Sequence, residues 1–139
     1  MQSIKPKWIK RIFVLILVIF ISYILYLNSL VKSQFSSEIE VKDNVIQVQN
    51  LIDDYPKDLI NMLLLVEDQS FFDHIGVDFK EIFRVLYGYL FKEKELRGAS
   101  TITQQLIKNT LLSSDKTLAR KTDEALMAIL MEMSYDKNF

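Results

Sequence analysis

The first pattern along the chain is a long run of hydrophobic residues near its N-terminus. Residues 12–31 read IFVLILVIFISYILYLNSLV, without a charged side chain and with Ser22, Asn28 and Ser29 as the clear polar interruptions. At about 1.5 Å per helical residue, a run of this length matches the roughly 30 Å hydrocarbon core of a bilayer. Apolar side chains occupy every face of such a helix, unlike the one-sided stripe of a soluble helix. The pattern therefore predicts a transmembrane anchor over residues 12–31.

A cleaved signal peptide and a buried core helix are the alternatives to an anchor. A signal peptide has an apolar region of about 7–15 residues and a small-residue cleavage site, which the following sequence lacks. A core helix rarely carries basic residues on one flank only, whereas here the leader of residues 1–11 contains Lys5, Lys7, Lys10 and Arg11. The positive-inside rule then predicts a cytoplasmic N-terminus and a body that faces the periplasm or the cell exterior.

Beyond the anchor, the hydrophobic pattern predicts a short extended segment followed by helices. Residues 32–50 begin as a polar linker and then alternate between apolar and polar side chains, which indicates a bent strand or a short pair of strands. Residues 51–139 show helical spacing instead. We expect one helix capped by Asp58 and ending near Ser70, one along 79–90, one capped by Ser100 or Thr101, and one over about 116–133. The predicted fold class is mainly α.

Composition and charge exclude several classes of protein. The chain has 139 residues, half of them hydrophobic, with only three Gly and two Pro. A disordered chain or a β-sandwich with many turns would not have this composition. The net charge of −1 shows no basic excess, so we expect no nucleic-acid partner. Because cysteine is absent, disulfides, thiolate metal sites and cysteine nucleophiles are excluded.

The pair Glu67-Asp68 is the first candidate for chemistry. It follows the apolar run LLLV, and apolar surroundings raise the pKa of a carboxyl group toward that of a useful general acid or base. Taken alone, however, the pair is better interpreted as a solvated helix end. His74 is the only histidine, so a metal site with several histidines is excluded and a structural role is the default.

Two later segments add further candidates. Residues 98–106 (GASTITQQL) gather hydroxyls and carboxamides where a predicted helix begins, a place where free N–H groups favour anions. Lys108 lies one turn beyond Gln104, and capping alone explains only one or two of these residues, so the segment favours a phosphate- or sugar-binding surface. A further cluster consists of Arg120, Lys121 and Glu124. Taken in isolation, it is better interpreted as an ordinary ion pair on a solvated helix face. The alternative interpretation is a carboxylate held beside cations that neutralise a leaving diphosphate.

Together the three segments resemble the motifs of the peptidoglycan glycosyltransferases, glycosyltransferase family 51. Members occur as monofunctional transglycosylases and as the N-terminal module of bifunctional penicillin-binding proteins. EDQSFFDHIG (67–76) resembles E-D-[RK]-x-F-x-x-H-x-G, and GASTITQQLIKN (98–109) resembles G-x-S-T-[IL]-T-Q-Q-x-x-K-N. Arg120-Lys121-x-x-Glu124-x-x-x-Ala128 resembles R-K-x-x-E-x-x-x-A. Gln69 departs from the first motif and removes one cation near its glutamate.

The resemblance implies a lysozyme-like helical domain on the outer face of the bacterial cytoplasmic (inner) membrane. It implies that this domain polymerises lipid II into glycan strands and releases a polyprenyl diphosphate. It implies that Glu67 is the general base on the acceptor hydroxyl and that Glu124 assists at the donor diphosphate. The implied substrate-binding residues are Asp68, Phe71, His74, Ser100, Thr101, Gln104, Gln105, Lys108, Lys116, Arg120 and Lys121. The implied partners are lipid II, the growing strand and membrane lipid. A divalent cation, Mg or Mn, is expected on the substrate diphosphate.

The resemblance also implies that the chain is truncated at its C-terminus. In the family, the region that matches residues 135–139 introduces further helices and two further motifs, so about the first half to two-thirds of the catalytic domain is expected here. The alternative to an active enzyme is therefore an inactive, membrane-anchored remnant or interaction module. A lysozyme-like hydrolase is the weakest alternative, because cations around Glu124 suit a diphosphate leaving group better than a neutral sugar.

Overall fold

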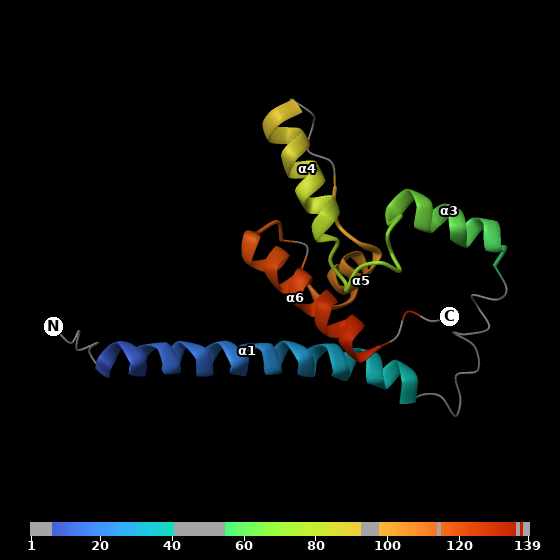
Figure 1. The fold of residues 1–139 in the computed structure, drawn as a ribbon. Helices are drawn as coiled ribbons and strands as arrows, with labels where there is room; N and C mark the ends of the chain where they lie inside the picture. The colour runs from blue at the N-terminus through green and yellow to red at the C-terminus, as the bar shows by residue number, and fades with distance from the viewer. Residues whose placement is uncertain (1–6, 41–54, 93–97, 114, 136, 138–139) are drawn as a thin grey trace.

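The computed structural model describes residues 7–40, 55–92, 98–113, 115–135 and 137 (Figure 1). Helices account for most of these residues, and no strand occurs among them, which confirms the mainly α prediction. The helices are α1 (Lys7–Glu40), α3 (Lys57–Glu67), α4 (Phe79–Lys92), α5 (Ile102–Leu111) and α6 (Leu118–Ser134).

Helix α1 is longer than the predicted anchor. It continues to Glu40, so the linker expected from residue 32 is helical as far as residue 40, and that part of the prediction is wrong. The predicted extended segment lies largely in 41–54, outside the described residues. The extension has a physical cause in packing: Leu27, Val31 and Phe35 are spaced four residues apart and form one buried face against α6.

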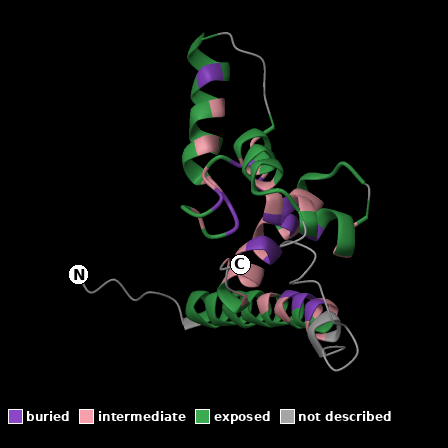
Figure 2. Ribbon diagram, turned by 90° about the vertical axis from the view of Figure 1, so that its right-hand side faces the viewer, coloured by how far each residue is buried: buried purple, intermediate pink, exposed green. Residues whose placement is uncertain are grey.

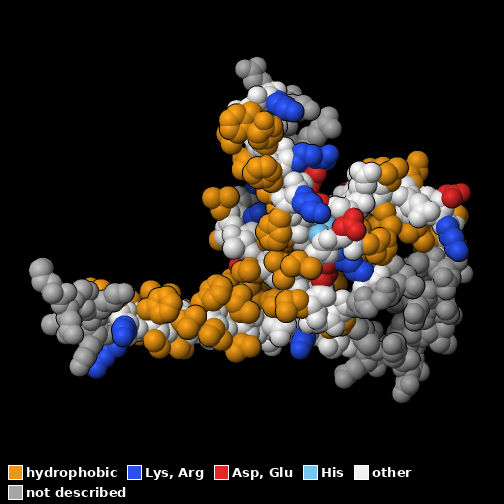
Figure 3. All heavy atoms as spheres, viewed as in Figure 1, with side chains coloured by type: hydrophobic (Ala, Val, Ile, Leu, Met, Phe, Trp, Pro, Cys, Tyr) orange, Lys and Arg blue, Asp and Glu red, His pale blue; other side chains and the backbone are white. Residues whose placement is uncertain are grey.

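The N-terminal part of α1 carries no such packing. By length and composition, Trp8–Ser36 could cross a membrane, and an 18-residue stretch within it has a mean hydropathy of 2.5. The side chains of residues 8–23 are all exposed, and Figure 3 shows hydrophobic side chains along the visible length of this helix. A helix that is apolar on all sides is stable in lipid rather than in water. These features support the predicted anchor.

The core lies where α1, α5 and α6 meet. Its buried residues are Leu27, Val31, Phe35, Ile107, Met127 and Ala128. Figure 2 shows burial concentrated in this region, whereas α3 has no buried residue and α4 only Gly88. Helices α3 and α4 extend away from the core and are joined to each other by residues 68–78, hereafter the 68–78 loop (Figure 1).

Helices α1 and α6 pack against each other at an incline, and α6 approaches α1 toward its C-terminal end (Figure 1). The Tyr23 hydroxyl donates a hydrogen bond to the Asp123 carboxylate near one end of the contact. Near the other end, the rings of Phe35 and Tyr135 meet edge to face with centroids 6.2 Å apart. The register of the two helices is therefore fixed at both ends.

The helix boundaries agree with the predictions for the later helices and differ in detail for α3. Asp58 lies in the first turn of α3 rather than at its cap, which is Pro56, and the helix ends at Glu67 before reaching Ser70. Proline suits the start of a helix because its missing N–H would have no intrahelical partner there. Thr101 caps α5 as predicted, and Thr117 caps α6.

Candidate active site

A cavity of about 860 Å³ lies between the end of α3, the 68–78 loop, the start of α4 and residues 98–101. Five of the predicted site residues line it: Glu67, Asp68, His74, Ser100 and Thr101. Charged residues just before and within the first turns of α4 belong to the same lining, namely Asp78, Lys80, Glu81 and Arg84. Acidic and positively charged side chains thus both belong to the lining of the space in which a substrate could bind.

Glu67 is the last residue of α3 and is exposed to solvent. The side-chain amide of Gln105 donates a 2.9 Å hydrogen bond to its carboxylate. The apolar walls expected around Glu67 do not form among the described residues, because Leu65 and Val66 are 63% and 73% exposed. The accessible carboxylate, held by one amide, can accept a proton from a bound hydroxyl.

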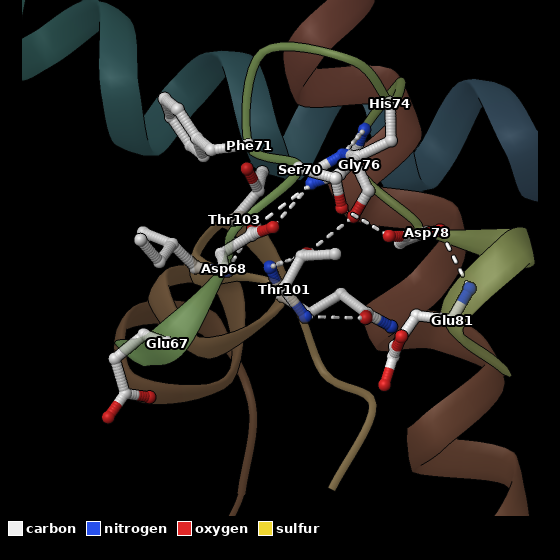
Figure 4. Close-up of polar contacts among 12 residues, drawn as sticks. Glu67, Asp68, Ser70, Phe71, His74, Gly76, Asp78, Glu81, Thr101 and Thr103 are labelled. Carbon is white, nitrogen blue, oxygen red and sulfur yellow. Dashed lines mark hydrogen bonds and ion pairs between the residues drawn. The ribbon is translucent and has the colours of Figure 1, made fainter. Parts of the chain in front are cut away.

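Asp68 points the other way and serves the structure of the loop (Figure 4). It is buried, and both of its oxygens lie 3.0 Å from Nε2 of His74. One of these oxygens also accepts a 3.0 Å hydrogen bond from the backbone N–H of Ile102, at the start of α5. Asp68 therefore fastens the 68–78 loop to α5 and supplies negative charge to the positive end of that helix.

The hydrogen bonds of His74 define its tautomer. The backbone N–H of Gly76 donates to Nδ1 over 3.2 Å, so Nδ1 is an acceptor. Nε2 then carries the proton and donates a hydrogen bond to the Asp68 carboxylate. Phe71 is buried beside this pair, with its ring edge-on to His74. His74 and Phe71 therefore shape the loop from inside.

Gly76 brings the first and third motifs into contact. Its φ of +89° lies in the left-handed region, and a Cβ there would lie 2.4 Å from the backbone oxygen of Ala128 in α6. Its own carbonyl accepts a 2.6 Å hydrogen bond from the Thr101 hydroxyl, so the second motif meets the same residue. The three segments are thus joined at one glycine.

The N-terminus of α5 is closed by the protein's own groups. Thr101 and Gln104 form a reciprocal capping box, with 3.1 Å hydrogen bonds in both directions, and both residues are buried. The Asp68 carboxylate in addition accepts a hydrogen bond from the Ile102 N–H. Backbone N–H groups that the sequence suggested for anion binding are therefore already bonded within the protein. The hydroxyl-rich segment therefore mainly stabilises the fold, and the positive charge needed to bind an anion must come from basic side chains.

We expect Thr101→Val to lower the free energy of unfolding by about 2–4 kcal/mol, because the buried threonine hydroxyl both caps α5 and satisfies the Gly76 carbonyl. Thr117→Val is the matched control: that threonine caps α6 at an exposed position, and its loss should cost about 1 kcal/mol. Urea unfolding in detergent micelles, followed by circular dichroism, measures both. Equal losses would show that the bond to Gly76 contributes nothing.

Glu124 is buried at 1% exposure and is paired with two cations. Arg120 Nη1 lies 2.7 Å from one carboxylate oxygen, and the Lys121 ammonium binds the other. The interpretation preferred from sequence, an ion pair on a solvated face, is therefore wrong. Lys121 also donates a 2.8 Å hydrogen bond to Ser100 Oγ, which lines the cavity. Arg120, Lys121 and Glu124 are not themselves part of the cavity lining, and Lys121 is connected to it through Ser100.

The remaining predicted residues are placed less centrally. Lys108 and Lys116 are exposed, and neither belongs to the lining of the cavity. Gln105 reaches the site through its bond to Glu67. Gln104 is buried in the capping box. Of the predicted cations, the described residues therefore bring Arg120 and Lys121 together and leave the other two lysines at the surface.

Asp78 is a residue that the motifs did not indicate. Its carboxylate accepts a hydrogen bond from the Ser70 hydroxyl and another, of 2.9 Å, from the backbone N–H of Glu81 in the first turn of α4. The hydrogen bond from Ser70 is the main reason why the pKa of Asp78 lies below its ordinary value. The spacing of Asp78 and Glu81, an acid followed three residues later by a glutamate, is a capping signal that could have been found in the sequence.

We expect Ser70→Ala to destabilise the chain more at neutral pH than in acid. A lowered pKa stabilises the folded state above the ordinary carboxyl pKa of about 4, and this stabilisation is lost as the pH falls through the folded-state pKa. The difference in unfolding free energy between wild type and Ser70→Ala should therefore be constant above about pH 5 and shrink toward pH 3. Urea unfolding at a series of pH values measures it. A difference that grows in acid contradicts the assigned role of Ser70.

Among the described residues, no group of three or more His, Asp and Glu side chains is placed to hold a metal ion. A cation coordinated by the protein alone does not fit the donors of this region. Glu124 is already bound to Arg120 and Lys121, and Asp68 to His74 and a backbone N–H group, whereas the exposed Glu67 accepts a hydrogen bond from the Gln105 amide.

Comparison with known proteins gives one family and a consistent set of relatives. The family model described as "Transglycosylase" matches residues 33–139. Penicillin-binding protein 1B of Haemophilus influenzae is 40% identical over 96 residues, which are 69% of this chain and 12% of that protein. Penicillin-binding protein 1F of Bacillus subtilis is 41% identical over 87 residues (63% and 12%), and penicillin-binding protein 1A of Neisseria flavescens is 44% identical over 87 residues (63% and 11%). The chain spans about a tenth of the length of these relatives.

Proposed function

The chain belongs to the transglycosylase family, and from this premise we propose that its site takes part in peptidoglycan glycosyl transfer. The proposed reaction polymerises lipid II into glycan strands. A hydroxyl of the acceptor sugar forms the new glycosidic bond to the anomeric carbon of the donor, and the bond from that carbon to the diphosphate breaks. The polyprenyl diphosphate leaves with the electron pair.

The buried Glu124 between Arg120 and Lys121 is the observation that carries this proposal. A carboxylate at 1% exposure orders both cations, and Lys121 continues to Ser100 on the cavity wall. Cations held in place beforehand stabilise the negative charge that develops on a leaving diphosphate. A hydrolase acting on a neutral sugar leaving group would gain little from them, which favours transfer from a diphosphate donor.

Glu67 is the proposed general base. Its carboxylate is accessible from the same cavity and is oriented by the Gln105 amide. It would remove the proton from the acceptor hydroxyl as the glycosidic bond forms, while the cations act on the donor side. The two carboxylates thus have different tasks because one is exposed and the other is buried and paired.

The proposed location follows from α1. Lipid II is anchored in a membrane, and a helix that could cross one precedes the site in the same chain. We propose a cytoplasmic N-terminus, supported by the basic residues before the apolar run, and an outward-facing body. A divalent cation, Mg or Mn, is proposed to bind with the substrate diphosphate, and the roles given to Glu67 and Glu124 do not depend on it.

Incubation of the purified chain in detergent micelles with lipid II and Mg²⁺ tests the proposal. Glycan polymer separated on a gel is the expected product. Absence of polymer at every enzyme concentration would contradict activity of this chain. Retained binding of radiolabelled lipid II without polymer would then support the alternative, an inactive membrane-anchored module of the same family.

A further inference from the structure

Lys137 lies just beyond the end of α6, and its half-buried side chain places the ammonium group against backbone carbonyls of the 68–78 loop. It donates a 2.8 Å hydrogen bond to the carbonyl of His74 and another to the carbonyl of Phe71. The same nitrogen lies 4.6 Å from the centre of the Phe71 ring, and the side chain is 15% exposed. An ammonium group that donates to two carbonyls and faces a ring fixes the course of this loop.

Glu132 holds Lys137 in this position. One oxygen of its carboxylate lies 2.9 Å from the ammonium, and the other accepts a 2.5 Å hydrogen bond from the Thr103 hydroxyl of α5. The Glu132 side chain is only 8% exposed. Glu132 and Lys137 therefore connect α5, α6 and the 68–78 loop through polar contacts that are largely shielded from solvent.

The 68–78 loop matters because it joins the two helices with the least support. Helix α3, which ends at Glu67, has no buried residue, and in α4 only Gly88 is buried. The position of the Glu67 backbone relative to the core thus depends on the residues that follow it, beginning with Asp68 and its bond to the Ile102 N–H, while the Glu67 side chain itself bonds to Gln105. A shift of this loop would move Glu67 away from the cavity it lines.

We propose that Lys137 is a positioning residue that clamps the 68–78 loop onto the C-terminal end of α6 and so keeps Glu67 in its place beside Gln105. Its consequence for catalysis rests on the function proposed above, whereas the clamp itself does not. Removal of the ammonium would leave the carbonyls of Phe71 and His74 without this donor and the Glu132 carboxylate without its cation. The loop would then open to water, because an unpaired buried charge is costly.

Hydrogen exchange of the full chain in detergent micelles, measured by mass spectrometry, tests the clamp. In Lys137→Met, we expect amides of residues 69–76 to exchange about tenfold faster or more, while those of residues 124–131 in α6 keep their rates. Lys57→Met, at an exposed lysine at the start of α3, should change neither set. Equal acceleration in α6 would show that Lys137 supports the whole fold and would overturn the positioning role, as would unchanged rates in 69–76.

The double variant Glu132→Lys with Lys137→Glu exchanges the two charges. It shows whether the loop is held by the hydrogen bonds that the Lys137 ammonium donates or by the ion pair alone. It restores opposite charges, but a carboxylate at position 137 cannot donate to the carbonyls of Phe71 and His74. We therefore expect the loop to remain fast-exchanging. Recovery of wild-type rates in this double variant would overturn the clamp, since charge pairing alone would then suffice.

Polymerisation assays give the catalytic consequence. If the wild-type chain polymerises lipid II, Lys137→Met should lower kcat about tenfold to a hundredfold with little change in KM, because a displaced base affects the transition state more than substrate binding. A change confined to KM would overturn the positioning of Glu67. If the wild type forms no polymer, the proposed function fails, and the exchange measurements still decide whether Lys137 clamps the loop.

Discussion

Glu67→Gln should lower the rate of lipid II polymerisation by about 10²–10⁴-fold, because an amide cannot accept the proton of the acceptor hydroxyl. The substitution conserves shape, and a glutamine carbonyl can still accept the hydrogen bond from Gln105. Glu67 is exposed, so no buried group loses a partner and the unfolding free energy should not change. Initial rates from gel-resolved polymer, combined with urea unfolding, separate the two effects.

Asp58→Asn is the matched control for this variant. It makes the same change from carboxylate to amide on the same helix, at an exposed position in the first turn of α3. Its polymerisation rate should equal that of the wild type. If Glu67→Gln polymerises lipid II as fast as Asp58→Asn does, Glu67 is not the base, and another carboxylate on the cavity must be.

Gly76→Ala should destabilise the chain by about 2–5 kcal/mol, since two separate costs add. The φ of +89° disfavours any side chain, and the new methyl group would lie 2.4 Å from a backbone oxygen of Ala128. Backbone cannot move aside as a flexible side chain can, so the 68–78 loop and α6 would have to separate. Lipid II polymerisation should fall as well, because the hydrogen bond from Thr101 to the Gly76 carbonyl depends on the same contact.

Gly98→Ala provides the comparison for Gly76→Ala. A Cβ at Gly98 meets nothing within 4 Å. Its free energy of unfolding should therefore equal that of the wild type or rise by a few tenths of a kcal/mol, as alanine restricts the unfolded chain. Urea unfolding of the two variants side by side measures the difference. Equal stability of both would mean that the loop and α6 do not touch at Gly76.

Local spacing was sufficient to predict most helices and one cap. The reciprocal pair of Thr101 and Gln104 follows from their separation of three residues, and α4 follows from apolar residues at helical intervals. The extension of α1 past Val31 could not be predicted in this way. It depends on Phe35 packing against Tyr135, a residue one hundred positions later, and hydropathy of the local segment contains no information about that partner.

The candidate site was located by sequence but its electrostatics were not. Glu124 follows Lys121 by three residues and Arg120 by four. This spacing is the same for a glutamate on a solvated face and for a buried one, which Glu124 is. Asp68 could not be assigned to the Ile102 N–H, because the bond joins segments 34 residues apart. Lys137 was missed for the same reason: its partners are backbone carbonyls, which every residue has, so no side-chain pattern indicates them.

The shared register of α1 and α6 couples the thickness of a bilayer to the position of the body. Tyr23, which bonds to Asp123, lies about 16 Å along the helix from Ile12, roughly half the hydrocarbon depth. The second half of the apolar run thus serves two environments, the lipid and the surface of α6. If α1 spans the membrane, a thicker bilayer places more of this second half in contact with lipid. A thinner bilayer leaves more of it in contact with α6. We therefore expect hydrophobic mismatch to tilt the helix or to pull the body, with its cations, toward the headgroups.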